Sequence, residues 1–499
     1  MTPDLHTPGG VLLALAPETV LVAWAMVVLL VLAWRHGDEA DQAFVGRLAS
    51  LGPLLTGAVL AWLWATVPEP VAGSHMVALD GFRFAAGAIV LVTAFGTIVL
   101  AVRFLERQRL IAPEFFVLVL FATCGMMLLA GASDLVMLFL GLELMSVPVY
   151  VLAAFDRYRR SSAEAGVKYF LMGAFSSGFL LYGIALVFGA TGETNLVAIG
   201  RQLAAHGMNT MAGIGLGMLL IAFFFKVAAV PFNMWAPDVY DGAPTPVTGF
   251  MATGIKAAAF VALVRVLQQA FPTATDLWQP IVALLAIGTI LVGNTVALAQ
   301  RSLKRMLAYS SMSHAGYLLV AVWANTTLGA TAVLVYLLAY AITTLAAFAV
   351  FVSIERVGSR TVLIDDLEGL FSVRPWVATS MGVLMLSLLG FPGTFGFIGK
   401  WYLIQACLAD GQVVLPIAVV VGSAISAGYY LPVIMEMTMK PTRSEQSHRQ
   451  VAFSRAAKAI VGVAVVANLV FGLWPTKPIE LAEAGARALV RQVQPLAGR

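Results

Sequence analysis

Charged residues are scarce in this sequence of 499 amino acids: they make up only 11%, whereas a soluble globular domain carries about 25%. Hydrophobic residues make up 60%, and the mean hydropathy is +0.90. This composition excludes a soluble globular protein and predicts an integral membrane protein. The small net charge of +4 comes from residues scattered among loops and does not indicate nucleic-acid binding. The first ten residues, MTPDLHTPGG, lack the basic start of a cleavable signal peptide, so the first apolar run is expected to remain as an anchor.

Cysteine and histidine are also rare, which excludes the common metal and haem sites. The two cysteines, Cys124 and Cys407, lie in apolar runs with no spacing suited to zinc or iron–sulfur ligation. Of the six histidines only His314 falls within an apolar run, whereas a bis-histidine haem needs two. The Gly-Lys pair at 399–400 is followed by tryptophan, so it is not a phosphate-binding loop. We therefore expect no cofactor in this chain itself.

About fourteen apolar runs reach the ~20 residues that a helix needs to cross a bilayer. They cover residues 11–34, 48–66, 79–104, 113–131, 134–154, 167–190, 211–235, 245–270, 279–299, 303–323, 328–354, 375–407, 413–438 and 454–474. The sequence thus predicts an all-α polytopic membrane protein. The 191–210 connection and the 475–499 tail are each expected to carry a short surface helix.

The distribution of lysine and arginine predicts the orientation. Most of the 30 basic residues follow odd-numbered runs, whereas Arg83 and Arg265 belong to the opposite side. Three lysines, Lys226, Lys256 and Lys400, lie inside apolar runs. The connections after odd-numbered runs are therefore expected to face the cytoplasm, and both termini to face outward.

Residues 213–264 are the most informative stretch, because two apolar runs there each carry a central lysine. Pro231 follows Lys226 by five residues and is expected to interrupt that helix just past the charge. A bare ammonium in hydrocarbon costs at least ~2.5 kcal/mol, so Lys226 and Lys256 predict a proton-carrying role. The alternative is a structural salt bridge.

A carboxylate and a further lysine accompany this pair. Glu143 lies nine residues past Asp134, which places it roughly 13 Å deep, and Ser146 and Tyr150 share its helix face. Buried acids mark ion pathways by default; the alternative is a neutral carboxylic acid bonded to a neighbouring helix. Lys168, at the start of its run, is either a relay group or a side chain that reaches back to the surface.

A third polar set surrounds His314 and Lys400. Ser310, His314 and Tyr317 share one helix face, and imidazole is the side chain that titrates nearest neutral pH. Two interpretations of His314 remain open: a proton relay, or a buried histidine whose ring nitrogens are hydrogen-bonded and that has only a structural role. The next run adds a stripe of hydroxyls, for which ordinary helix–helix hydrogen bonding is the simpler explanation.

The glycines and the proline around Lys400 predict a second interrupted span. The break after Lys226 lies in span 7 and the break beside Lys400 lies in span 12, so the two broken spans are five apart. This spacing predicts two inverted five-helix repeats, spans 4–8 and 9–13, because an odd number of spans per unit reverses the second copy. The expected organisation is a three-span segment (1–110), two repeats (111–270 and 271–440), and a last span with its tail (441–499).

Several segments resemble the antiporter-like subunit N of NADH-quinone oxidoreductase, the proton-translocating membrane arm of respiratory complex I. They are PEFFVLVLFATCGMMLLAGASDLVMLFLGLELMSVPVYVLAAF, AEAGVKYFLMGAFSSGFLLYGIALVFGATGET, VPFNMWAPDVYDGAPTPVTGFMATGIKAAAF and LKRMLAYSSMSHAGYLL. The match covers about 110 to 440, and PDVYDGAPTPVT is its sharpest marker. The resemblance implies that Glu143 pairs with Lys226, that Lys256 and Lys400 continue a central axis, and that Lys168 matches a further lysine.

The same resemblance implies the partners and the compartment. The chain would translocate protons in a bacterial inner membrane, beside the antiporter-like subunits M and L, the small subunits K and J, and lipid. FMN, iron–sulfur clusters and quinone would belong to partner subunits. Two alternatives remain open: a subunit of a multi-subunit sodium/proton antiporter, which shares the fold, and a structural role in which buried charges only lock helices together.

Overall fold

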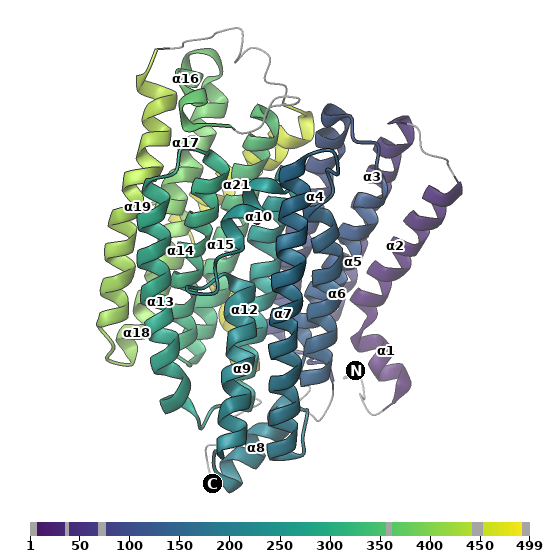
Figure 1. Cartoon of the computed structure of the whole chain (residues 1–499), viewed down its shortest axis with the longest axis vertical. Coiled ribbons are helices and arrows are strands. Elements are labelled where there is room, and N and C mark those ends of the chain that lie inside the picture. Colours follow the sequence, from purple (N-terminus) through teal and green to yellow (C-terminus); the bar gives the residue numbers. More distant parts are fainter. Residues whose placement is uncertain (1–6, 35–38, 68–75, 356–361, 442–452, 492–499) are drawn as a thin grey trace.

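The structure is a computed structural model that describes residues 7–34, 39–67, 76–355, 362–441 and 453–491. Its described part consists of long helices packed side by side, with their axes mostly along one direction (Figure 1). Twelve of them are long and apolar enough to cross a membrane. Adding α14 and the paired α17 and α18 to those 12 brings the crossings to the expected fourteen. The prediction of an all-α polytopic membrane protein is confirmed.

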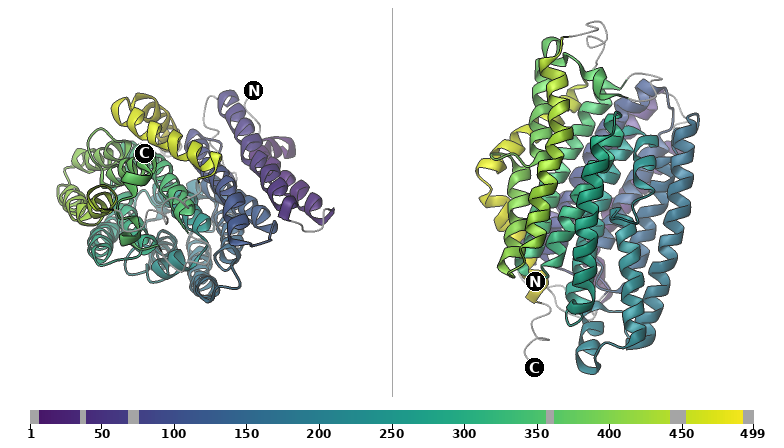
Figure 2. Two further views of the ribbon diagram at one scale, coloured as in Figure 1. Left: turned by 90° about the horizontal axis from the view of Figure 1, so that it is seen from above. Right: turned by 60° about the vertical axis from the view of Figure 1, so that its left-hand side comes forward.

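The N-terminal segment supplies the first three crossings. Its helices are α1 (Pro8–Ala14), α2 (Ala16–Trp34), α3 (Glu39–Thr66) and α4 (Gly81–Gln108). Asp80 starts α4 by accepting a hydrogen bond from the Arg83 backbone N–H at 2.8 Å. Seen from above, α2 and α3 lie at one edge of the bundle (Figure 2).

The next helices form the first predicted repeat. They are α5 (Glu114–Gly131), α6 (Leu135–Ala153), α7 (Arg160–Thr191), α8 (Leu196–His206), α9 (Thr210–Val227), α10 (Ala236–Gly242), α11 (Thr245–Phe250), the π-helix η1 (Met251–Ile255) and α12 (Lys256–Ala270). The predicted break is present: α9 ends at Val227, and Ala228 takes a left-handed conformation with φ 58°. The short helix predicted in the 191–210 connection is α8.

The second predicted repeat and the C-terminal helices follow. They are α13 (Thr275–Leu298), α14 (Leu303–Trp323), α15 (Thr327–Ile354), the 3₁₀ turn η2 (Ile364–Leu367), α16 (Leu370–Val373), α17 (Pro375–Leu389), α18 (Phe395–Ala409), α19 (Val414–Met439), α21 (Arg455–Leu473) and α22 (Thr476–Arg491). The twelfth crossing is broken between α17 and α18, as predicted. The tail carries the expected helix, α22, which packs on α4 and α15. The inverted relation of the two repeats and the limits of the four segments remain predictions.

The core of the bundle lies around the lysine-bearing crossing made by α11, η1 and α12. That crossing is completely buried, and α15 beside it is nearly so, whereas α2, α7 and α21 are mostly exposed at the periphery. Charged side chains inside this core are thus surrounded by protein and not by lipid. Polar partners are needed to offset the free-energy cost of burying them.

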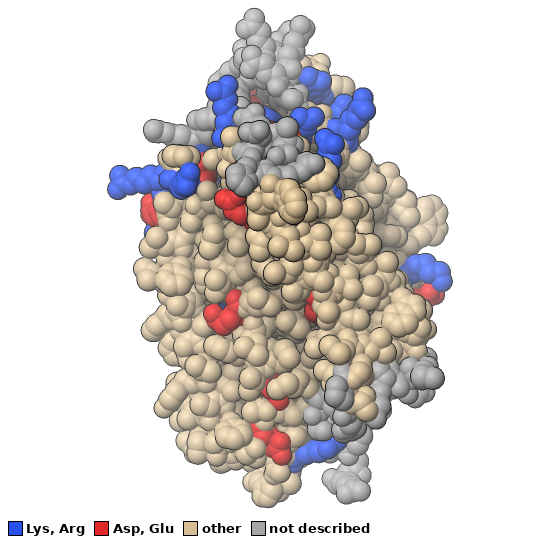
Figure 3. All heavy atoms as spheres, turned by 90° about the vertical axis from the view of Figure 1, so that its right-hand side faces the viewer, with Lys and Arg blue, Asp and Glu red and all other residues tan. Residues whose placement is uncertain are grey.

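The two ends of the bundle differ in charge. On the face drawn in Figure 3, lysine and arginine side chains gather mainly at the upper end, and the middle carries only scattered charged side chains, most of them acidic. Helices α1 and α8 lie at the lower end (Figure 1), and which end faces the cytoplasm remains a prediction. The terminal residues themselves, 1–6 and 492–499, lie outside the described residues.

Two arginines assigned to the outer connections are buried inside the protein. Arg265 is 0% exposed and makes a two-pronged ion pair with Asp80, at 2.7 and 2.9 Å. Arg83 makes a similar pair with Glu18, at 2.7 and 2.8 Å. This cluster ties α2, α4 and α12 together at the lower end. Each of the two arginines lies near the end of its helix and is buried together with a carboxylate partner.

Candidate functional site

Lys226 lies at the break of the seventh crossing, in a pocket of neutral partners. It is the second-last residue of α9 and is 1% exposed. Its Nζ donates to Ser146 Oγ at 2.7 Å and to the Tyr150 hydroxyl at 3.3 Å. It also lies 5.3 and 5.7 Å from the ring centroids of Tyr150 and Tyr169. Hydroxyls and ring faces, not a carboxylate, therefore hold this ammonium.

Glu143 is close to Lys226 but does not pair with it directly. The two residues interact electrostatically, yet they do not approach within 4 Å as an ion pair. Glu143 is half-buried on α6 and accepts a hydrogen bond from Ser177 Oγ of α7. The direct pair implied by the family resemblance is thus not observed. Ser146, one turn along α6, occupies the position nearest the ammonium.

Lys256 follows the π-helix and points at α14. Its Nζ donates to the backbone carbonyl and the hydroxyl of Ser311, and Ser311 Oγ also accepts from the Tyr340 hydroxyl at 2.9 Å. The five-residue π-helix η1 ends at the residue before Lys256. Such widened turns are frequent at functional sites because they leave backbone groups free of regular helical pairing.

His314 joins three helices through its two ring nitrogens. Nδ1 lies 2.6 Å from the Tyr336 hydroxyl of α15, and Nε2 lies 3.1 Å from the Tyr430 hydroxyl of α19. The Tyr430 hydroxyl also bonds Ser310. Of the predicted stripe, Ser310 and His314 thus share one partner, while Tyr317 packs edge-on to the imidazole at 5.6 Å. Both imidazole nitrogens are satisfied, and both partners can donate or accept.

Lys400 lies against the break of the twelfth crossing. Its Nζ donates to the Leu389 carbonyl at 2.7 Å and to Ser423 Oγ at 2.9 Å. Leu389 is the last residue of α17, where carbonyls lose their helical partners. The two half-helices touch closely: a Cβ at Gly396 would lie 1.8 Å from the Ser387 carbonyl oxygen. Glycine at 396 is therefore required for this packing.

A small cavity connects His314 with Lys400. Its lining includes Tyr336, Tyr340 and Ser387, and about 10 Å³ of it is open to the centre of a water molecule. That volume is about enough for one water. From Lys256 through Ser311, Tyr340 and this cavity, polar groups succeed one another as far as Lys400.

Aromatic side chains fill the space between Lys226 and Lys256. Tyr169 stacks on Trp235 at 4.4 Å, and Trp235 packs edge-on to Tyr240 at 6.0 Å. The Tyr240 side chain in turn approaches Ser311, the partner of Lys256. Tyr240 belongs to the PDVYDGAPTPVT segment, but the sequence did not show that this tyrosine lies between Trp235 and Ser311.

Lys168 lies outside this row, at the basic end of the bundle. Its Nζ contacts Asp238 Oδ2 at 2.9 Å and Glu164 Oε1 at 2.7 Å, and its side chain is 40% exposed. Arg305 of α14 contacts the other oxygen of Asp238 at 3.2 Å. Lys168 therefore helps to join α7, α10 and α14 at the surface, and a relay role for it stays a prediction.

Asn468 was not singled out from the sequence, although it is the central acceptor of a buried network. It lies in the last crossing, α21, and is 0% exposed. Its Oδ1 accepts from Thr343 Oγ1 at 2.9 Å and from Ser387 Oγ, which lies at the break near Lys400. A lone asparagine in a span is a weak signal, and nothing in the sequence indicated its partners.

No group of three or more His, Cys, Asp or Glu residues that could hold a metal ion occurs in the described ranges. The site is thus built from lysines, one histidine and hydroxyl groups. Such a set has the chemistry of proton transfer, because each member can give up or accept a proton without covalent change.

Comparisons with known proteins identify the family of the chain. The sequence model of a family described as NADH:quinone oxidoreductase/Mrp antiporter, transmembrane, matches residues 132–426. NADH-quinone oxidoreductase subunit N of Gemmatimonas aurantiaca is 42% identical over 496 residues, covering 96% of this chain and 94% of that protein. Subunit N 2 of Roseiflexus castenholzii is 42% identical over 476 residues, covering 93% and 94%.

Two solved structures have the same fold. A chain of respiratory complex I from Thermus thermophilus is 36% identical, with a TM-score of 0.79, and the match covers 94% of this chain and 100% of that one. A chain of the Mrp complex from a Dietzia species has a TM-score of 0.84 at 22% identity, covering 97% and 99%. At that identity the second match shows the fold alone.

Proposed function

This chain belongs to the subunit N family of NADH-quinone oxidoreductase, and we propose that it moves protons along the row Glu143, Lys226, Lys256, His314 and Lys400. It is a membrane subunit of a proton-translocating enzyme complex. Its energy would come from redox chemistry in other subunits.

Glu143 would act as the input. It is half-buried on α6 and bonded to Ser177 of α7, so its charge is open to influence from a neighbouring subunit. Because Ser146 separates it from Lys226, it would act through the electric field and not through a contact. When the negative charge is drawn away, Lys226 would release its proton towards Tyr240 and Lys256.

The second half of the row would carry the proton outward. Lys256, Ser311 and Tyr340 are in contact, and Tyr340, His314 and Lys400 line one cavity. This continuity is the single observation that carries the proposal. Grotthuss-type transfer needs successive groups that both donate and accept, and hydroxyls, imidazole and a trapped water satisfy that requirement.

The partners in this proposal are other complex I membrane subunits: the antiporter-like M and L and the small K and J. FMN, iron–sulfur clusters and quinone would lie on partner subunits. The chain would sit in a bacterial inner membrane with both termini on the periplasmic side. The family model covers both NADH:quinone oxidoreductases and Mrp antiporters. The 42% identity to subunit N proteins, against 22% to the Mrp chain, favours the first function.

Lys256→Met in the assembled complex tests the proposal. Proton pumping in proteoliposomes is expected to fall to a small fraction of the wild-type value, because methionine keeps the volume but cannot carry a proton. The matched control is Lys440→Met, which removes an exposed lysine with two carboxylate partners outside the row and should pump nearly normally. Full pumping by Lys256→Met at an unchanged rate of NADH oxidation would refute the proposal.

A further inference from the structure

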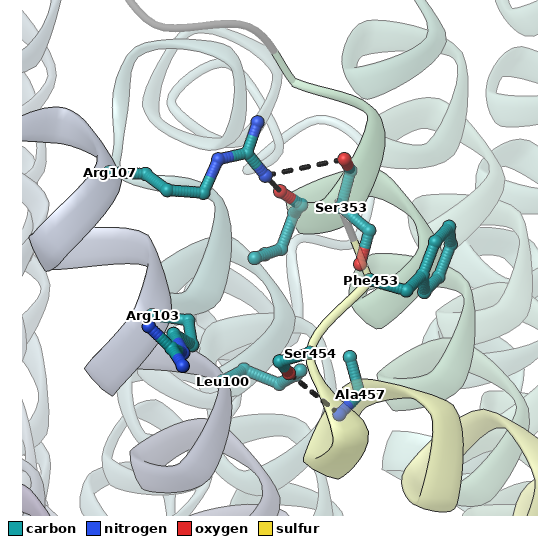
Figure 4. Close-up of a pocket in the computed structure, with 8 residues that line it drawn as sticks. Leu100, Arg103, Arg107, Ser353, Phe453, Ser454 and Ala457 are labelled. Atoms are coloured by element: carbon teal, nitrogen blue, oxygen red, sulfur yellow. Dashed lines mark hydrogen bonds between the residues drawn. The ribbon is translucent and has the colours of Figure 1, made fainter. Parts of the chain in front are cut away.

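A pocket outside the proton row opens at the basic end of the bundle, between α4, α15 and α21. It has a volume of about 290 Å³ (Figure 4). Leu100, Arg103 and Arg107 line it from α4, and Val352 and Ser353 from α15. The third wall is the start of α21, with Phe453, Ser454 and Ala457.

The pocket carries positive charge that its own carboxylates do not cancel. Arg107 donates to three neutral backbone carbonyls, those of Val352 at 3.0 Å, Ser353 at 3.3 Å and Glu355. No carboxylate in the described ranges forms an ion pair with it. Its guanidinium is thus fixed in place while its charge remains uncompensated.

Arg103 is the second basic side chain that lines the pocket. It is 66% exposed and donates one hydrogen bond to Glu106 at 2.8 Å, which leaves further N–H donors of its guanidinium for a ligand. Arg455 and Lys458 lie in the first turn of α21, beside the lining residues Ser454 and Ala457. The rim and wall together therefore favour an anion.

The surface leading away from the pocket is apolar and continuous with the membrane-facing side of the bundle. On α4, Val99, Phe95 and Val92 follow Arg103 at intervals of three or four residues, which places them on its face. Val92 is 51% exposed, and Val463 on α21 is 70% exposed. A molecule with an anionic head in the pocket would find apolar surface for its tail along both helices.

We propose that this pocket binds the phosphate headgroup of an anionic phospholipid. The phosphodiester would accept hydrogen bonds from Arg103 and Arg107, and the acyl chains would lie along the exposed faces of α4 and α21. Basic pockets between transmembrane helices on the arginine-rich side are suited to such headgroups. Free phosphate would make no contact with the apolar lining residues Leu100, Val352 and Phe453. An acidic protein segment would have no need of the exposed apolar residues on α4 and α21.

The first experiment measures lipid retention by the purified whole complex. The complex is exchanged into detergent from nanodiscs that contain phosphatidylglycerol and phosphatidylcholine, and the bound lipids are counted by native mass spectrometry. We expect one more phosphatidylglycerol in the wild type than in the Arg103→Gln/Arg107→Gln double variant. Its affinity should fall roughly thirtyfold in the variant, because each basic residue near an anionic surface contributes about 1 kcal/mol.

Two controls separate lipid binding from damage to the fold. Arg157→Gln removes an exposed arginine whose partner is Tyr158, and it should retain the lipid. Arg103→Gln alone leaves the contacts of Arg107 with α15 intact and should still weaken retention. Equal retention in wild type and variants, or no preference for phosphatidylglycerol over phosphatidylcholine, would overturn the proposal.

A second experiment identifies the occupant directly. Phe453 is replaced by p-benzoylphenylalanine, and the complex is irradiated in its native membrane. A cross-linked phospholipid supports the proposal, whereas a cross-linked partner polypeptide overturns it. Inorganic phosphate at millimolar concentration should not displace the lipid; full displacement would assign the pocket to soluble phosphate.

Discussion

Replacing Lys226 with methionine separates a proton-carrying role from a structural one, because the two roles predict opposite results for stability. The partners of Lys226 are Ser146, Tyr150 and the face of Tyr169, all of them neutral. In a structural salt bridge, removal of one partner leaves a buried charge unpaired and costs about 3–5 kcal/mol. Here no carboxylate is left in direct contact with the vacated site.

The expected change in stability is small. Keeping an ammonium in the membrane interior costs at least ~2.5 kcal/mol. Its hydrogen bond to Ser146 offsets about 1.5–3 kcal/mol of that, and the contacts with two rings add about 0.5–2 kcal/mol. These contributions nearly cancel, so Lys226→Met should change the free energy of unfolding by no more than about 2 kcal/mol in either direction.

Function should respond very differently. Proton pumping is measured in proteoliposomes by quenching of a pH-sensitive dye while NADH oxidation is followed in the same sample, and the thermal transition of the purified complex gives stability. We expect a stable complex that has lost most of its pumping. Lys226→Arg is a second test of the proton-carrying role. Arginine keeps the positive charge but does not release a proton in proteins, so this variant should also fail to pump. Undiminished pumping at full electron transfer in either variant would refute the reasoning, as would a complex that falls apart in Lys226→Met and pumps normally whenever it assembles.

Three further predictions concern Tyr240, Asn468 and Asp80. Tyr240→Phe removes the hydroxyl beside Ser311 and should slow pumping several-fold while stability changes by less than about 1.5 kcal/mol; an unchanged pumping rate would exclude Tyr240 from the path. Asn468→Leu deprives Thr343 and Ser387 of their shared acceptor and should cost about 2–4 kcal/mol in a thermal unfolding assay, whereas no loss would mean that water replaces the amide. Burial alone would raise the pKa of Asp80, but its ion pair with Arg265 holds that pKa below the usual value. The stability it contributes should therefore be complete above about pH 4 and be lost as the pH falls further, and a complex in which Asp80→Asn leaves this acid-induced loss unchanged would contradict the assignment.

The breaks and the lysines were predictable from sequence because local chemistry determines them. Proline, at 231 and at 392, removes a helical hydrogen bond, and the glycines around Lys400 weaken a helix through their conformational freedom. The lengths of the apolar runs indicated the spans. The π-helix before Lys256 was not predictable, because MATGI contains no residue that requires a widened turn. It depends on packing against neighbouring helices.

The partners of each charge were less predictable than the charges themselves. Glu143, Ser146 and Tyr150 were correctly placed on one face of α6, but only the tertiary structure decides that Ser146 and Tyr150 reach Lys226. The pairing of Arg265 with Asp80 joins residues 185 positions apart. Sequence periodicity reports the direction of a side chain on its own helix and not the element that it meets.

Lys226 and Lys400 have different hydrogen-bond partners at the two broken crossings. This difference bears on the proposed proton path. At the first break the carbonyl of Phe225 accepts from the Ala228 backbone N–H at 3.1 Å and from the indole of Trp235 at 3.0 Å, and Lys226 bonds hydroxyls. At the second break Lys400 itself takes the free carbonyl of Leu389. A backbone carbonyl is a fixed acceptor, whereas a hydroxyl rotates and can pass a proton on. Lys226 is therefore held by groups that permit release in either direction, and Lys400 is anchored where a proton would leave the row.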